Sequence, residues 1–136
     1  MEKDFGKFAA ISAALAGIVG FAYAVSFVIL KEPGLSALFL MLSGLVALPA
    51  MLALFNKLKG VEANFALLAL IFGVVGSIGY LLHGGYDLAN VINPPSAANI
   101  SLPSQVDPRG LLAFGVTGLA ILKISWLAQK SKAFPD

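Results

Sequence analysis

Four long apolar runs dominate the chain, and short polar segments separate them. The runs cover residues 8–30, 35–55, 62–83 and 110–128. Each is close to the ~20 residues that an α-helix needs to cross the hydrocarbon core of a bilayer. Apolar residues fill the runs instead of alternating with polar ones, which disfavours the strands of a membrane barrel. The pattern predicts an all-α integral membrane protein, a single domain over residues 1–136 built as a four-transmembrane-helix bundle.

The composition supports this fold class and narrows the partners. Hydrophobic residues make up 59% of the chain and charged residues 12%, against roughly 25% charged residues in an ordinary soluble domain. The formal net charge of +2 gives no indication of nucleic-acid binding. The absence of cysteine excludes disulfides and thiolate metal ligands. The expected partner is therefore the lipid bilayer, together with other membrane subunits or further copies of the chain.

The first run could also be read as a signal peptide. Lys3 and Lys7 precede it, and residues 22–24 (Ala-Tyr-Ala) resemble a cleavage site. The apolar run nevertheless continues to Leu30, and the acidic residues at positions 2 and 4 dilute the basic lead. We expect this run to be retained as the first span.

Basic residues are distributed unevenly between the two sides of a four-span chain. Seven of the nine lie at the termini, near the end of the fourth run or in the segment after the second run, and the other two are Lys31 and Arg109. Basic residues mark the cytoplasmic side. The bias predicts a protein of the plasma (inner) membrane with both termini cytoplasmic and the segment 84–109 outside. Lys123 interrupts the fourth run and, with Trp126, fits an interfacial belt in which the lysine reaches toward water.

Residues 84–109 form an unusually long connection, because helix–helix links in bundles usually have ~2–8 residues. The two glycines at positions 84 and 85 are expected to end the third helix. The segment has few charges and keeps several aliphatic residues, which is not the composition of a disordered linker. We expect an ordered loop that folds over the outer end of the bundle. Asp107 followed by Pro108 is typical of a helix start.

The candidate binding residues all lie in or beside this connection. They are Tyr80, His83, Tyr86, Asp87, Asn90, Asn93, Asp107 and Arg109. If the third helix continues past the glycines, His83 and Asp87 are four residues apart on one face, so the carboxylate would orient the imidazole. The simpler alternatives are that His83 caps the end of the helix and that the tyrosines anchor the helix ends at the membrane interface.

The spans contain little that could carry chemistry. No Asp, Glu, Arg or His lies near the middle of a run, which disfavours a proton-coupled transporter. No catalytic residues are assigned, and one histidine with one aspartate gives too few ligands for a metal ion. No cofactor is evident, although a single axial histidine would be enough for haem or chlorophyll.

The sequence therefore favours a non-catalytic function. We expect an accessory subunit or binding module whose outer loop contacts a partner, a lipid or a pigment. Stripes of small residues such as Gly73, Gly76 and Gly79 suit close helix packing. The alternatives are an oligomeric transporter or channel and, with His83 as a base, an enzyme that acts on lipids at the outer interface.

Overall fold

The computed structural model describes residues 3–94 and 107–131, and it confirms the four-helix fold. Helices contain 91% of these residues, and no strand occurs among them. The elements are α1 (Lys3–Ala24), η1 (Val25–Leu30), α2 (Pro33–Leu58), α3 (Ala63–Ile92), α4 (Pro108–Gly110), η3 (Leu111–Gly115) and α5 (Val116–Lys130). The α1–η1 and α4–η3–α5 series each form one continuous span. All four spans are long and apolar enough to cross a membrane.

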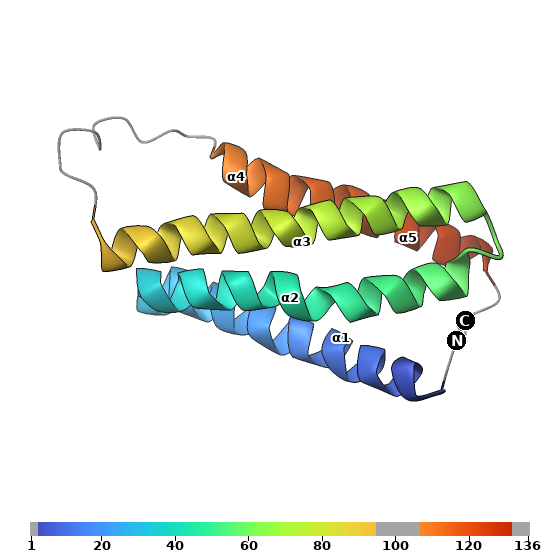
Figure 1. The fold of residues 1–136 in the computed structure, drawn as a ribbon, viewed down its shortest axis with the longest axis horizontal. Coiled ribbons are helices and arrows are strands. Elements are labelled where there is room, and N and C mark those ends of the chain that lie inside the picture. Colours follow the sequence, from blue (N-terminus) through green and yellow to red (C-terminus); the bar gives the residue numbers. More distant parts are fainter. Residues whose placement is uncertain (1–2, 95–106, 132–136) are drawn as a thin grey trace.

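The four spans lie side by side in the order α1, α2, α3 and α5 (Figure 1). α3 is the central helix, because α2 packs on one side of it and α5 with η3 on the other. In the described part of the chain, no backbone contact joins α1 or η1 to α4, η3 or α5. The backbones of the first and fourth spans therefore do not touch each other.

Small residues allow the neighbours of α3 to approach closely. An ideal Cβ at Gly79 would lie 2.8 Å from Cα of Ala113, and one at Gly84 would lie 2.5 Å from the carbonyl oxygen of Ala37. Both distances are too short for a side chain, so these glycines bring η3 and α2 within backbone contact of α3. This is the packing function expected of small residues in a membrane bundle.

The predicted end of the third helix at residue 83, and with it a loop over 84–109, is wrong. α3 continues through both glycines to Ile92, and the next helix already begins at Pro108. Gly84 has ordinary helical geometry, since no glycine among the described residues has a positive φ. The missing side chain of Gly84 lets α2 approach closely. The backbone of Gly84 continues the helix without interruption. The predicted ordering of the outer loop falls mainly on residues 95–106, which lie outside the described residues.

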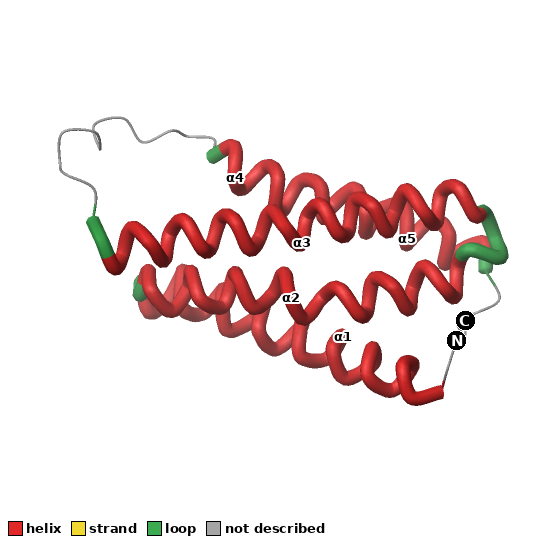
Figure 2. Tube along the Cα trace, in the orientation of Figure 1, coloured by secondary structure: helices red, strands yellow, loops and turns green. Residues whose placement is uncertain are grey.

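The opposite end of the bundle carries the two terminal helix ends and the α2–α3 connection (Figure 1). Leu58, Ala66 and Leu127 form a buried core there, with Phe55 and Ile124 packed against it. The connections at both ends are short where they are described, with residues 31–32 before α2 and residues 59–62 before α3 (Figure 2). The start of α1 and the end of α5 therefore lie at the same end of the bundle, as an even number of spans requires.

Candidate functional site

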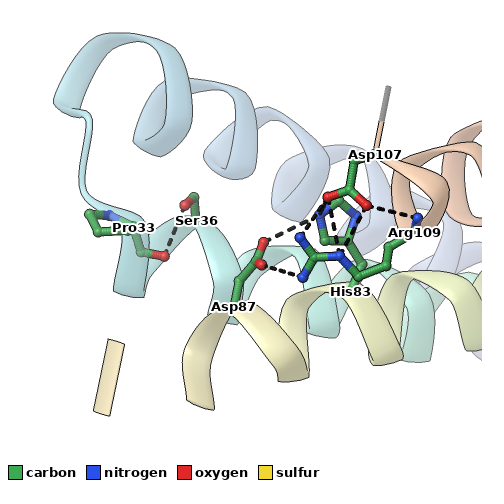
Figure 3. A network of polar contacts seen from close by, with 6 residues as sticks. All are labelled: Pro33, Ser36, His83, Asp87, Asp107 and Arg109. Carbon is green, nitrogen blue, oxygen red and sulfur yellow. Dashed lines mark hydrogen bonds and ion pairs between the residues drawn. The ribbon is translucent and has the colours of Figure 1, made fainter. Parts of the chain in front are cut away.

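Four charged or titratable side chains meet at the end of the bundle opposite the start of α1 and the end of α5 (Figure 3), which the sequence predicts to face outside. His83 and Asp87 come from α3, Asp107 from the residue before α4, and Arg109 from α4. We call these four residues the outer cluster. It joins two spans that neighbour each other in space but are separated by a long stretch of chain.

Arg109 lies at the centre of the outer cluster and binds both carboxylates. Its Nη1 lies 2.8 Å from Oδ1 of Asp87, and its Nη2 lies 2.6 Å from Oδ2 of Asp107. Its Nε also donates to the Asp107 carboxylate at 3.0 and 3.1 Å. The planar guanidinium is suited to such forked contacts, which a lysine could not reproduce. The guanidinium carbon also lies 4.4 Å from the centre of the Tyr86 ring, a cation–π contact that holds the arginine from a second direction.

His83 lies beneath this ion-paired layer. Its Nε2 is 3.3 Å from Oδ2 of Asp87 and 3.6 Å from Oδ2 of Asp107. The His83 side chain is 12% exposed, whereas the two aspartates and Arg109 are each more than one-third exposed. Its other ring nitrogen, Nδ1, is buried and has no hydrogen-bond partner among the described residues. A buried polar atom without a partner is costly.

The local sequence explains how the cluster forms. Continuation of α3 past the glycines places His83 and Asp87 one helical turn apart on the same face. Asp107 caps the next helix by accepting a hydrogen bond from the backbone N–H of Arg109 at 2.9 Å, and Pro108 occupies the first turn. The predicted helix start is therefore confirmed. The same carboxylate caps the backbone and binds the guanidinium.

Arg109 also controls the protonation of Asp107. Hydrogen bonds from the Arg109 side chain lower the pKa of Asp107 from 3.8 to about 2, although partial burial acts in the opposite direction. The backbone N–H bond of the helix cap and the charges of Arg109 and His83 lower it further. Asp107 therefore stays ionised at all physiological pH values.

A cleft of about 770 Å³ opens beside the outer cluster, between α1–η1, α2, α3 and the start of the fourth span. Its polar wall contains the outer cluster together with Lys31, Glu32 and Asn90. The rest of its wall is apolar or aromatic. Those residues are Tyr23, Phe27, Pro33, Ala37, Leu40, Val91 and Phe114, and Ser36 adds a hydroxyl that bonds to a backbone carbonyl. The volume is within the ~300–1,000 Å³ typical of small-molecule sites.

Aromatic rings close the inner side of the cleft. Phe114 lies 6.1 Å from Tyr23 and 5.0 Å from Tyr80, measured between ring centres, and it also faces His83. Tyr23 stacks on Phe27 at 5.7 Å. These side chains bridge the two spans whose backbones do not touch. The cleft therefore changes from charged at its outer end to aromatic and apolar toward the middle of the membrane.

Two local distortions border the cleft. The first span ends in the π-helical η1, and the fourth begins with the π-helical η3; π-helical turns are frequent at functional sites. Lys31, directly after η1, has φ 55° and is the one residue other than glycine with positive φ in the described chain. Glycine is the usual residue at such a helix end. Lys31 therefore holds a backbone conformation that costs free energy for a residue other than glycine. It also lines the cleft with a positively charged side chain.

The structure brings together most of the residues predicted from the sequence. The outer cluster contains His83, Asp87, Asp107 and Arg109, and Tyr86 lies under Arg109. Asn90 lines the cleft, and Tyr80 packs inside the bundle against Phe114. Asn93 is exposed at the end of α3 and does not line the cleft.

Sequence reasoning missed the contribution of the first two spans. Tyr23, Phe27, Lys31 and Glu32 form the wall that faces the outer cluster. The sequence features that could have pointed to this wall are Tyr23 in the second half of the first run and the charged pair Lys31 and Glu32 before Pro33. Neither feature shows by itself which other part of the chain these side chains face.

The arrangement can hold and orient a polar group, but the described residues do not supply an obvious catalytic set. The Ser36 hydroxyl donates to the Pro33 carbonyl and is not hydrogen-bonded to His83. No group of three or more His, Cys, Asp or Glu side chains is placed to hold a metal ion in the part of the chain that the structure describes. Axial ligation of haem or chlorophyll stays a prediction, and it would need a ring nitrogen of His83, of which Nε2 faces the two carboxylates.

Comparison with known proteins gives no further guide to the site. No family model, curated protein or solved structure matches the chain.

Proposed function

We propose that the protein is a membrane-embedded binding module whose outer cleft holds the polar head of an amphipathic molecule. The single observation that carries this proposal is the cleft itself, with charged and hydrogen-bonding groups at its outer end and aromatic side chains below them. An amphipathic molecule matches such a gradient. Tyr23, Phe27 and Phe114 lie between the first and fourth spans at this level, so an apolar tail would lie against their rings.

The charges of the cleft favour a head without negative charge. Arg109 is already neutralised by two carboxylates, and Lys31 is followed by the acidic Glu32. An anionic head would have to compete with these carboxylates for the guanidinium and would lie close to them. An uncharged head with hydroxyl or carbonyl groups avoids this repulsion.

We expect a short-chain diacylglycerol, used as an uncharged probe, to bind the purified protein in mild detergent. Asn90→Trp should abolish this binding, because the indole would fill the cleft without removing a member of the outer cluster. Asn90→Ala is the matched control, since it removes the same amide and leaves the space open. Native mass spectrometry would report the bound probe. Equal binding by both variants would contradict the proposal. Binding of phosphatidylglycerol that Asn90→Trp abolishes and Asn90→Ala keeps would also contradict it, because that lipid would then occupy the cleft.

The proposal includes an orientation: both termini are cytoplasmic and the outer cluster faces the opposite side. The uneven distribution of lysines supports it. The chain has no cysteine, so single cysteines can be introduced at Glu32 and at Lys59, which are exposed at opposite ends of the bundle. In sealed cells, an impermeant maleimide should label Glu32→Cys but not Lys59→Cys. Lys59→Cys should be labelled only after the cells are permeabilised. The reversed pattern would refute the orientation.

Membership in a larger assembly as an accessory subunit stays a prediction. The same holds for the transporter or channel and for the lipid-acting enzyme. The cleft supports ligand binding more directly than any of these, because its lining combines both parts of an amphipathic surface.

A further inference from the structure

A second groove lies at the other end of the bundle, on the side where α5 meets the beginning of α3. Phe65, Leu119, Leu122, Lys123 and Trp126 line it, and its volume is about 470 Å³. It shares no residue with the outer cleft. Leu119 and Leu122 are 47% and 68% exposed, so the apolar part of the groove faces the lipid chains of a surrounding bilayer.

An ammonium group lies at one side of this groove. The Nζ of Lys123 is 4.8 Å from the centre of the Phe65 ring, and that ring packs edge-on against Trp126 at 5.3 Å. No carboxylate among the described residues forms an ion pair with Lys123. A cation–π contact offsets part of the cost of holding a charge beside apolar residues. It does not neutralise the charge, so the ammonium still favours an anion.

A second ammonium group lies at the same aromatic pair. The Nζ of Lys130 is 3.8 Å from the centre of the Trp126 ring, and it too lacks a carboxylate partner in the part of the chain that is described. Lys130 is the last residue of α5, whereas Lys123 lies about two turns further into the span. The two charges therefore flank the aromatic pair from the helix end and from within the membrane region.

We propose that this groove binds an anionic phospholipid of the adjacent leaflet. The phosphate lies between Lys123 and Lys130, the glycerol backbone lies against Trp126, and an acyl chain follows Leu119 and Leu122. Two ammonium groups without carboxylates favour a lipid with net negative charge over a zwitterionic one, whose own cation would lie close to the lysines. Tryptophan commonly occupies the headgroup level of a membrane. This inference does not depend on the outer cleft.

The test compares phosphatidylglycerol with phosphatidylcholine of identical chains, using the full chain in mild detergent and native mass spectrometry. Wild-type protein should retain phosphatidylglycerol preferentially. Lys123→Gln should reduce that preference roughly five-fold, the amount expected for one basic residue near a lipid headgroup. Lys123→Arg should keep it. Lys59→Gln is the matched control: it removes the same charge from the same end, where Lys59 lies over Phe55 and outside the groove.

A further variant separates a defined site from general attraction to positive charge. Leu119→Trp fills the groove and keeps both lysines, so it should also lose the preference, and it does not depend on whether Lys123→Gln folds. The proposal is overturned if wild-type protein retains both lipids equally. It is also overturned if Lys59→Gln lowers the preference as much as Lys123→Gln, or if Leu119→Trp has no effect. Binding of the diacylglycerol probe to the outer cleft should be unchanged in all of these variants.

Discussion

Replacing Gly79 by alanine is expected to destabilise the folded bundle by about 1–3 kcal/mol, the usual cost of an overpacked interior. The added Cβ would lie 2.8 Å from Cα and 2.9 Å from N of Ala113, and 3.1 Å from the carbonyl carbon of Leu112. All three are backbone atoms, so no side-chain rotation can relieve the contact. α3 and the fourth span would have to separate, which would also displace Phe114 and the aromatic side of the cleft.

Gly118→Ala provides the control, because Gly118 lies on α5 and an added methyl group there would have nothing within 4 Å. Alanine is a better helix former than glycine by up to ~1 kcal/mol, so this variant should be neutral or slightly more stable. Unfolding in mild detergent with increasing denaturant would compare the two variants. A Gly79→Ala variant as stable as Gly118→Ala would show that the close approach of the two helices is not needed for stability.

The number and type of the spans could be predicted from the sequence, because a bilayer imposes a minimum length on any apolar helix. The end of the third span could not be predicted correctly. A pair of glycines can stop a helix or allow another helix to approach, and only the position of Ala37 on α2 decides between these functions for Gly84. That information lies in a different part of the chain. A one-dimensional pattern therefore placed the helix end too early.

The same distinction applies to the candidate site. The four-residue spacing of His83 and Asp87 is a local feature, so the sequence predicted their contact once the helix continued. The contact between Arg109 and Asp87 joins residues 22 positions apart, and the sequence suggested it only because charges are scarce in this region. The opposite wall of the cleft, with Tyr23 and Phe27, depends on how the first span packs. The pattern of residues within the first run does not indicate that Tyr23 will lie against Phe114 of the fourth span.

Arg109→Gln is expected to loosen the outer cluster and to destabilise the protein by on the order of 1–2 kcal/mol, at the low end of the ~1.5–3 kcal/mol typical of hydrogen bonds to charged groups. The variant loses the link between α3 and α4, and it leaves the carboxylates of Asp87 and Asp107 near the same nitrogen of His83 without the guanidinium between them. The cost should be smaller than for a fully buried ion pair, because all three charged side chains are more than one-third exposed to solvent. Lys31→Gln is the matched control. It removes a positive charge from the same end that has no ion pair among the described residues, and its effect should be small.

The pH dependence of the stability difference between wild-type protein and Arg109→Gln shows whether the ion pair with Asp107 causes that difference. In the wild-type protein, Asp107 has a folded-state pKa of about 2, below its ordinary value of 3.8. Its stabilising contribution is therefore complete above about pH 4 and is lost as the pH falls toward about 2. In Arg109→Gln the pKa of Asp107 should return toward the ordinary value, because the hydrogen bonds that lower it are gone, while His83 still lies against both carboxylates.

The stabilities of wild-type and variant protein should therefore converge in acid. Thermal unfolding in mild detergent, followed from about pH 6 to about pH 2, would measure this convergence. The stability of Asp107→Asn, like that of Arg109→Gln, should fall less than that of wild-type protein as the pH is lowered. Asparagine still caps the helix but has no carboxylate to protonate. A difference between wild type and Arg109→Gln that stays constant down to about pH 2 would mean that Arg109 stabilises the bundle through packing on Tyr86, and that its ion pair with Asp107 contributes nothing measurable.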